Sequence, residues 1–140
     1  NRLGAYRLAS DRWVRRLGAD SVDAALNAAR DQGIGIMIFV GNRGCIQIHS
    51  GKIEKLVPMG PWSNVMDPAF NLHLRRDHIA EVWAVSKPTD RGVAISIEAF
   101  DRDGGLILQL FPVPKAGKDS RPEWARIVDS IPSADAREVA

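Results

Sequence analysis

The sequence predicts an α+β protein in which a large curved antiparallel β-sheet, arranged as a meander, is flanked by N-terminal helices and a C-terminal helix. Helix-like spacing of apolar residues fills the first part of the chain, and short β-rich runs separated by turn residues fill the middle. A proline-led amphipathic segment follows them. The links between the β-rich runs are too short for crossover helices, which favours antiparallel pairing over a parallel α/β sheet.

Two helices are expected before residue 34. Residues 3–18 form the first, because apolar residues recur there at helical spacings and Gly18 supplies a stop. Those apolar residues are Leu3, Tyr6, Trp13 and Leu17. Residues 21–32 form the second, with Ser21 placed to cap the exposed amides and Gly33 to end the helix. Its apolar stripe consists of Val22, Ala25, Leu26 and Ala29.

Roughly six or seven strands are then expected, because β-rich runs alternate with turn residues at regular spacing. The runs are residues 34–40, 45–49, 52–57, 70–75, 79–87, 93–100 and 106–111. Glycines and short polar residues predict tight hairpin turns at residues 42–44, 49–52 and 101–105. The turn at 101–105 carries the strongest signal of the three.

The chain is expected to close with a helix over residues 122–131. Prolines after Phe111 cannot donate to a strand ladder, whereas Pro122 suits the first turn of a helix. The inward side of this helix would carry Trp124, Ile127, Val128 and Ile131. Residues 1–131 are therefore expected to form a single domain, and residues 132–140 a flexible tail.

Composition narrows the class of function. At 140 residues with 45% hydrophobic content, the chain suits one ordinary core. A net charge of +2, with the basic residues scattered, argues against a nucleic-acid partner. No apolar stretch reaches the length of a membrane span, and the single cysteine cannot form an internal disulfide. The expectation is a cytoplasmic protein without membrane insertion.

The three histidines, His49, His73 and His78, are the nitrogen ligands that the chain offers to a metal. No pair has the helical spacing of a zinc site, so a dedicated zinc site is not expected. Strand alternation places His49 and His73 each on the more polar side of its strand. Each is therefore interpreted first as a sheet-surface residue and second as a metal ligand.

Two further side chains leave alternatives open. Cys45 is interpreted as a small buried hydrophobe or, less readily, as a thiol paired with a histidine of a neighbouring strand. His49 cannot be that base, because residues four apart on one strand lie roughly 13 Å apart. Trp62 follows a bend at Gly60 and Pro61, where its ring would form either a corner packed on the core or the wall of a ligand pocket.

A mixed surface is expected from the later strands. Gln109 and Phe111 share one side of their strand, and Lys87 ends a strand whose same-side neighbours include Trp83 and Val85. A flat apolar ligand with carboxylates would suit aromatic and aliphatic groups against its plane and cations at its edge. The other interpretation is an ordinary half-exposed sheet face.

The sequence resembles the bacterial hemin-degrading factors, which are also described as cytoplasmic haem-trafficking (haem utilisation) proteins. The resemblance runs from about residue 2 to residue 124 and depends on the order and spacing of several segments. These segments are IMIFVGNRGCIQIHSG, KIEKLVPMGPW, FNLHLR, IAEVWAVSKPT, the DRDGG hairpin and LQLF. Members contain two similar halves, and this chain is similar to the C-terminal half.

The resemblance implies a saddle-shaped antiparallel sheet and a haem ligand held between the two halves. Arg2, Lys87, Gln109 and Phe111 match the haem-contacting residues of the family. The iron-binding histidine of the family precedes the segment matching Arg2, so it would lie upstream of residue 1. His73, His49 and His78 remain minor candidates for that ligand.

Two departures from the family pattern affect the carboxylate contacts of the haem. Members can have tyrosine where this chain has Phe111, so the ring is kept but a hydroxyl hydrogen bond is lost. An arginine that follows in the family is replaced here by Pro114 or displaced onto Lys115. One propionate contact of the family is therefore not expected in its usual form.

The implied function is haem binding and cytoplasmic haem transport for iron acquisition. The alternatives are reductant-dependent cleavage of the haem ring, and a structural half that binds haem only with its partner half. A binding and transport role is favoured over an enzymatic one, and no residue is assigned a catalytic role. The expected partners are haem, the N-terminal half of the same protein, and a second copy in a homodimer.

Overall fold

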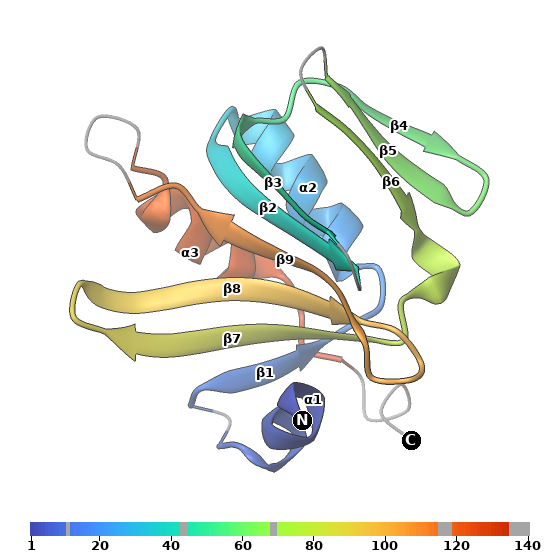
Figure 1. Ribbon diagram of the computed structural model, residues 1–140. Coiled ribbons are helices and arrows are strands. Elements are labelled where there is room, and N and C mark those ends of the chain that lie inside the picture. Colours follow the sequence, from blue (N-terminus) through green and yellow to red (C-terminus); the bar gives the residue numbers. More distant parts are fainter. Residues whose placement is uncertain (11, 43–44, 68–69, 115–118, 135–140) are drawn as a thin grey trace.

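The computed structural model describes residues 1–10, 12–42, 45–67, 70–114 and 119–134. Within these residues there are three α-helices and nine strands, and the strands form two antiparallel sheets (Figure 1). The predicted α+β class, with an antiparallel sheet between N-terminal helices and a C-terminal helix, is confirmed. None of the helices in the described residues is long and apolar enough to cross a membrane.

The larger sheet has six strands in the order β1-β7-β8-β9-β2-β3. Their bounds are Val14–Leu17, Glu81–Thr89, Gly92–Phe100, Leu106–Pro112, Gly35–Asn42 and Cys45–Lys52. The smaller sheet contains β4 (Leu56–Met59), β5 (Trp62–Asp67) and β6 (Phe70–Arg75) in sequence order. The strands expected as one meander therefore divide between two sheets, and the pairing of β9 with β2 joins the late hairpins to the early one.

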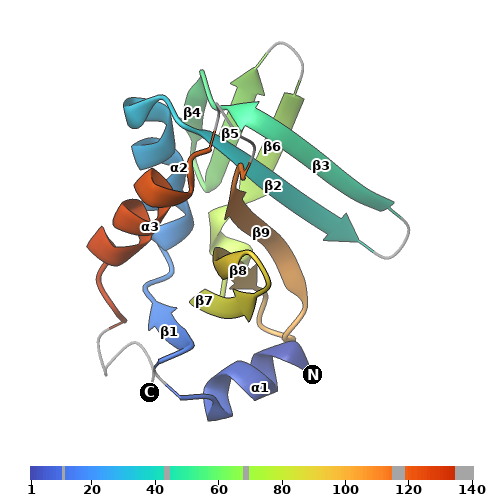
Figure 2. The same cartoon turned by 90° about the vertical axis from the view of Figure 1, so that its left-hand side faces the viewer.

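The main core lies between the larger sheet and the helices α2 (Ser21–Gln32) and α3 (Arg121–Ser130), which cover the same face of it (Figure 2). The indole of Trp124 in α3 is fully buried and donates a hydrogen bond from Nε1 to the Ile95 carbonyl at 3.0 Å. The smaller sheet adds Val65, Leu72 and Leu74 to this core. The predicted inward residues of both helices are buried, as expected.

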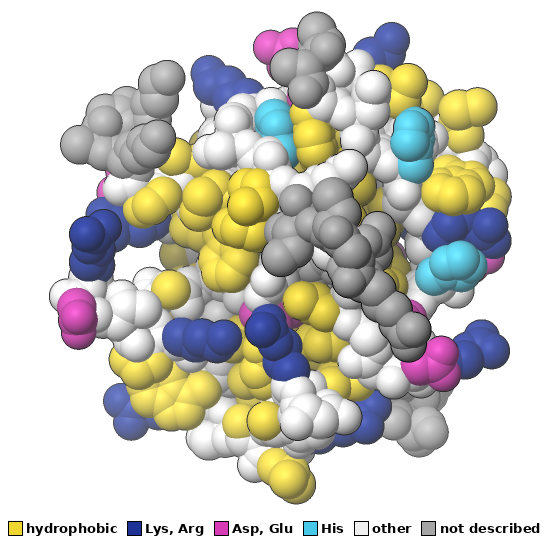
Figure 3. All heavy atoms as spheres, in the orientation of Figure 1, with side chains coloured by type: hydrophobic (Ala, Val, Ile, Leu, Met, Phe, Trp, Pro, Cys, Tyr) yellow, Lys and Arg dark blue, Asp and Glu magenta, His cyan; other side chains and the backbone are white. Residues whose placement is uncertain are grey.

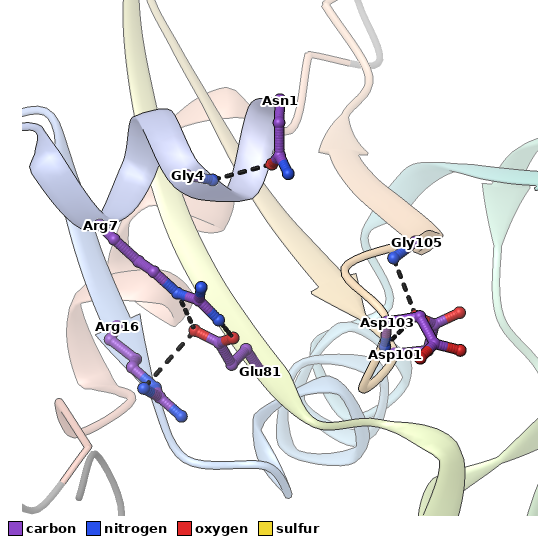
Figure 4. Close-up of polar contacts among 8 residues, drawn as sticks. All are labelled: Asn1, Gly4, Arg7, Arg16, Glu81, Asp101, Asp103 and Gly105. Carbon is purple, nitrogen blue, oxygen red and sulfur yellow. Dashed lines mark hydrogen bonds and ion pairs between the residues drawn. The ribbon is translucent and has the colours of Figure 1, made fainter.

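A separate apolar cluster holds the short helix α1 (Arg2–Leu8) against the other face of the larger sheet. Its members are Leu3, Tyr6, Val14, Trp83, Val85 and Phe100. The side chain of Asn1 caps α1 by accepting a hydrogen bond from the Gly4 amide at 2.9 Å (Figure 4). The two faces of the larger sheet are thus covered differently, by α2 and α3 on one side and by α1 on part of the other.

The prediction of one helix over residues 3–18 is wrong in its second half. Helix α1 ends at Leu8, and Val14–Leu17 form β1, which pairs with β7. Val14 and Leu17 point to opposite faces of the sheet, and each belongs to a different apolar cluster. An edge strand that buries both faces places apolar residues three apart, which is also a helical spacing.

The Ser21 prediction is also corrected in detail. Helix α2 spans the predicted residues and ends at Gly33, whose φ of 64° is the left-handed conformation that glycine adopts readily. Ser21 is however the first residue of the helix, and Asp20 occupies the cap position without a side-chain hydrogen bond. The apolar stripe correctly predicted the helix, whereas the sequence did not correctly predict its capping residue.

Residues 49–67 differ most from the sequence-based expectation. The turn predicted at 49–52 lies inside β3, where Gly51 still pairs with Ile36. The run predicted at 52–57 is split, since β3 ends at Lys52 and β4 begins at Leu56. Residues 62–67 form β5, which was not expected. Its pattern is obscured by buried polar residues such as Asp67, whose carboxylate accepts hydrogen bonds from the Glu54 and Lys55 amides.

Two other predictions agree with the structure. The turn at 101–105 joins β8 to β9, and the Asp101 carboxylate accepts hydrogen bonds from the amides of Asp103 at 2.9 Å and Gly105 at 2.8 Å (Figure 4). The C-terminal helix forms as α3. Strands β2 and β3 pair as a hairpin, but residues 43–44 of its turn lie outside the described residues. The flexible tail over residues 132–140 stays a prediction, because residues 135–140 also lie outside the described residues. Within the described part of this segment, Ser133 forms an isolated antiparallel bridge with Leu17.

Candidate functional site

The strand register brings Lys87 and Gln109 to the same face of the larger sheet. Lys87 in β7 pairs with Ala94 in β8, and Glu98 in β8 pairs with Gln109 in β9. Ala94 and Glu98 are four residues apart on one strand, so their side chains point to the same side. It is the side on which α1 packs, because Trp83 pairs with Glu98 and belongs to the α1 cluster. We call this side of the sheet the α1 face.

Aromatic and aliphatic groups continue the α1 face across β9 and β2. Gln109 pairs with Phe39, and Phe111 pairs with Met37. The rings of Phe39 and Phe111 meet edge to face, with centroids 5.4 Å apart. The three strand-to-strand steps from β7 to β2 span roughly 14 Å at about 4.8 Å each. That width is sufficient for a large planar ligand to lie across the strands.

Cationic groups border this apolar area. Figure 3, which views the molecule as in Figure 1, shows hydrophobic side chains gathered over β9 and β2 and Lys or Arg side chains over β7. Lys87 is exposed near the end of β7. Arg2, in the first turn of α1, reaches Glu98 with a 3.2 Å contact while 44% of its side chain stays exposed. The predicted residues Arg2, Lys87, Gln109 and Phe111 therefore all border or line one face.

A buried carboxylate that the sequence reasoning missed lies in the middle of this face. Glu98 is fully buried and accepts hydrogen bonds from the Tyr6 hydroxyl at 2.7 Å, Arg2 Nη1 at 3.2 Å and the Ser96 hydroxyl at 3.0 Å. Burial, followed by the hydrogen bond to Glu98, raises the pKa of Tyr6, so the phenol keeps its proton and remains a donor. The signal available in the sequence was an acidic residue inside the largely apolar run VAISIEAF.

A second buried carboxylate fixes the other end of α1. Glu81 in β7 contacts Arg7 of α1 and, at 3.5 Å, Arg16 of β1 (Figure 4). Burial alone would raise the pKa of Glu81, but the hydrogen bond from Arg7 and the two positive charges outweigh it and lower that pKa. Helix α1 is thus held to the sheet by charged contacts near both of its ends.

None of the three histidines, all of which lie in the described residues, is on the α1 face. His49 in β3 pairs with Ile38, a core residue of the helix-covered face, and its ring stacks on Phe70 with centroids 4.2 Å apart. His73 lies exposed on β6 of the smaller sheet, and His78 lies in the 3-10 helix Arg76–His78. No group of three His, Cys, Asp or Glu side chains in the described residues could hold a metal ion.

His73 is the histidine with the most defined orientation. Its Nδ1 lies 2.7 Å from Oδ1 of Asn64, whose amide nitrogen donates to the Val57 carbonyl at 3.1 Å. Because Asn64 is oriented by that second bond, its oxygen accepts the Nδ1 proton of His73. In the neutral form of the ring, the lone pair is then on the other nitrogen, Nε2. This is the arrangement of a histidine able to bind a metal, but it lies on a different sheet from Lys87.

A large cleft lies beside the smaller sheet. It has a volume of about 830 Å³ and lies between β6, the 3-10 helix and the β8–β9 hairpin, with His73, His78 and Trp62 among its lining residues. Trp62 is 36% exposed and carries the Arg75 guanidinium over its ring at 5.1 Å. Of the two interpretations of Trp62, the structure therefore supports the wall of a cleft. A smaller cavity of about 190 Å³ adjoins the α1 face at Phe111.

The remaining candidates add little to this site. The side chain of Cys45 and the whole of Lys115 lie outside the described residues. Pro114 is exposed just beyond the end of β9 and lines the smaller cavity beside Phe111. Pro114, one of the two positions that the resemblance offers for the family arginine, is thus close to the aromatic part of the face.

Comparison with known proteins gives concordant matches. The family description "Haemin-degrading HemS.ChuX domain" matches residues 1–131. The hemin transport protein HemS of Yersinia enterocolitica is 40% identical over 123 residues, which cover 88% of this chain and 36% of that protein. The chain therefore spans little more than a third of the length of this curated relative.

Two solved structures share both fold and sequence with the chain. The haem-binding protein PhuS of Pseudomonas aeruginosa superposes with a TM-score of 0.89 at 44% identity, covering 95% of this chain and 39% of that one. ChuS, described as an E. coli heme oxygenase, superposes with a TM-score of 0.87 at 38% identity, covering 94% and 40%. Each match covers nearly all of this chain.

Proposed function

Since the chain belongs to the haemin-degrading HemS/ChuX domain family, we propose that it binds haem on the α1 face and serves haem trafficking for iron acquisition. One observation carries the proposal: Lys87, Gln109 and Phe111, with Arg2 beside them, converge on a single face. The transport names of its relatives support the trafficking role. A cytoplasmic location belongs to the same proposal, supported by the single cysteine.

The face suits the two chemical parts of haem. The rings of Phe39 and Phe111 offer apolar contact to the porphyrin plane, and Gln109 adds a polar tip between them and Glu98. Lys87 and Arg2 offer charge-assisted hydrogen bonds to the propionates. When bound, haem itself supplies an iron with axial positions to fill.

The proposal assigns the axial iron ligand to a histidine outside these 140 residues. It is supported by the placement of the three histidines of the chain, none of which faces the same side as Lys87 and Gln109. Of the three, His73 has the free ring nitrogen best defined by its neighbours, so it is the alternative ligand to test first. The family resemblance implies a histidine upstream of the segment that matches Arg2.

Energetics indicate how much the missing ligand matters. Burying roughly 400 Å² of porphyrin at about 25 cal/mol/Å² contributes on the order of 10 kcal/mol, against an association cost of roughly 4 to 15 kcal/mol. Apolar contact alone therefore barely offsets that cost. Firm binding depends on the iron–nitrogen bond and on the propionate contacts of Arg2 and Lys87, so we expect the isolated chain to bind haem weakly.

Haem titration followed by the Soret band tests the proposal. The 140-residue chain should show weak 1:1 binding that is reduced by Lys87→Ala and Gln109→Ala. An unchanged titration in both variants would refute the α1 face as the site. Tight binding with a sharp Soret band that is lost in His73→Ala would instead refute the assignment of the iron ligand.

A second candidate function is oxidative opening of the haem ring. The similarity to ChuS, described as a heme oxygenase, favours it. The ring carbons would be oxidised by O₂ with electrons from an external reductant, and the protein would supply orientation and access. Incubating the haem-loaded, full-length protein with a reductant, with catalase present to remove free peroxide, tests it. Tetrapyrrole cleavage products would support an enzymatic function. Intact haem would instead favour a function in haem binding and transport.

The third candidate is a structural half that needs its partner half to bind haem. The observation that favours it is that the chain spans only 36% of HemS. Substituting Lys87 and Gln109 in the full-length protein separates this role from direct binding. Unchanged haem uptake would favour the structural role, whereas weaker uptake would place the contacts on this half.

A further inference from the structure

We propose that Glu98 is a positioning residue for the haem propionates, because it holds the Arg2 guanidinium at the border of the haem face. The inference rests on the proposed function, since it presumes that haem lies on the α1 face. Glu98 lies between Trp83 and Gln109 in the strand register. The 3.2 Å contact of its Oε1 with Arg2 Nη1 therefore places the guanidinium beside the predicted contact residue Gln109.

The burial of Glu98 makes this tether strong. The side chain is fully buried, and a buried carboxylate is tolerated only when charge and hydrogen bonds compensate it. Among its partners in the described residues, Tyr6 and Ser96 supply neutral donors and Arg2 supplies the positive charge. Moving Arg2 away would leave a buried charge with hydroxyl partners alone, so the guanidinium is expected to stay when a ligand arrives.

Arg2 nevertheless keeps capacity for a second carboxylate. A guanidinium has five N–H donors in a planar fork, and Glu98 receives a hydrogen bond from one of its nitrogens. Its side chain is 44% exposed. Arg2 can therefore bridge the buried Glu98 on one side and a propionate on the other. A long side chain held in this way loses less conformational freedom on binding than a free one.

The two buried carboxylates under α1 differ in this respect. Glu81 is compensated by two arginines, Arg7 and Arg16, and lies at the other end of the helix. Glu98 is next to Gln109 and, within the described part of the chain, pairs with one arginine. Both anchor α1, but Glu98 alone links that helix to the predicted haem contacts, so Glu81 provides the matched control.

Binding of haem and of its dimethyl ester, which lacks propionate charges, by the 140-residue chain tests the inference. Glu98→Gln keeps the side-chain shape and should weaken haem binding by about fivefold to tenfold, the size of one lost charge-assisted contact. Arg2→Ala should weaken it similarly, and the double variant no further, because both remove one interaction. Binding of the dimethyl ester should be unchanged in all three variants. Glu81→Gln should leave the ratio of haem to ester affinity as in the unsubstituted chain.

Several outcomes would overturn the inference. If Glu98→Gln lowers the affinities for haem and for the ester equally, Glu98 acts only by stabilising the fold. The same conclusion follows if conditions that stabilise the folded variant restore its haem affinity. Additive losses in the double variant would show that Glu98 and Arg2 act separately. If the unsubstituted chain binds haem and both single variants bind it equally well, the positioning role of Glu98 is refuted, while the proposed haem-binding function stands. If the unsubstituted chain binds neither porphyrin, the proposed function fails and this inference with it.

Discussion

The two faces of the larger sheet differ sharply in chemistry. The face under α2 and α3 is lined by aliphatic side chains that are nearly or fully buried, and they come from β7, β8, β9 and β2. They are Val82, Ala84, Ile97, Ala99, Leu108, Leu110, Ile36 and Ile38. The α1 face carries two buried carboxylates, Glu81 and Glu98, and the polar or charged residues Lys87 and Gln109 on the same strands.

The same strands therefore stabilise the fold with one face and present ligand-binding groups on the other. Side chains alternate between the two faces, so each strand contributes one residue to the core and the next to the ligand side. Apolar burial on the helix-covered face gives most of the free energy of folding. The α1 face can then keep groups that cost desolvation energy, provided that arginines and hydroxyls compensate them. Substitutions on the helix-covered face should therefore lower the free energy of unfolding, whereas substitutions on the α1 face should lower haem affinity.

The largest effect is expected from Trp124→Ala on the helix-covered side. It removes a fully buried indole and its hydrogen bond to the Ile95 carbonyl, and should lower the free energy of unfolding by about 3–5 kcal/mol. Urea unfolding followed by circular dichroism measures this change. Arg126→Ala, an exposed position of the same helix, should change it by less than about 0.5 kcal/mol. Weaker haem binding by the folded fraction of Trp124→Ala would contradict the division of roles between the two faces.

The next effect is expected from Lys87→Ala on the α1 face. Loss of a propionate contact should weaken haem binding by about tenfold, or about 1.4 kcal/mol, while the free energy of unfolding stays within about 0.5 kcal/mol. Lys55→Ala, an exposed lysine in the link between β3 and β4, is the matched control. Equal affinities in the two variants would show that Lys87 does not contact the ligand.

A smaller effect, in the opposite direction, is expected from Phe111→Tyr. The ring should keep its edge-to-face contact with Phe39, and the added hydroxyl should restore the hydrogen bond that the family pattern implies. One neutral hydrogen bond contributes about 0.5–1.5 kcal/mol, so haem affinity should rise by a few fold up to about tenfold. Titration with haem and its dimethyl ester side by side measures the gain. A haem affinity equal to that of the unsubstituted chain would show that the added hydroxyl makes no contact with haem.

The smallest effect is expected from the pH dependence of Glu81. Its pKa is lowered in the folded protein below its ordinary value of 4.5, because the contacts of Arg7 and Arg16 outweigh burial. The unfolded chain therefore binds more protons near that pH, and stability falls as the pH drops through and below about 4.5. Glu81→Gln should make the urea midpoint less sensitive to pH in that window. An unchanged slope would show that the Arg7 contact does not persist in solution.

Much of the fold could be predicted from local patterns. Helix α2, the β8–β9 hairpin and helix α3 each carry their own signals, namely an apolar stripe with Gly33, the DRDGG turn and a proline-led start. Strands β1 and β5 could not be found in this way. The apolar spacing of β1 imitates a helix because both of its sides are buried, and β5 hides Asp67 and Asn64 in hydrogen bonds that form only in the assembled sheet.

The candidate site divides in the same way. Strand alternation indicated from the sequence that Gln109 and Phe111 share a side, because that relation lies within one strand. That Lys87 is on the same side follows only from the pairing of three strands. The role of Glu98 was hidden, since its partners Tyr6 and Arg2 are more than ninety residues away in the sequence.

Neighbours within a few residues determine helices α2 and α3, the turn at 101–105 and the kinds of side chain offered to a planar anionic ligand, so these could be predicted from the sequence alone. The tertiary structure alone decided which strands are adjacent, how they divide into two sheets and which face receives each buried charge. Strand pairing and charge compensation join residues distant in sequence, and a carboxylate such as Glu98 is stable in the interior only once those partners have been brought to it.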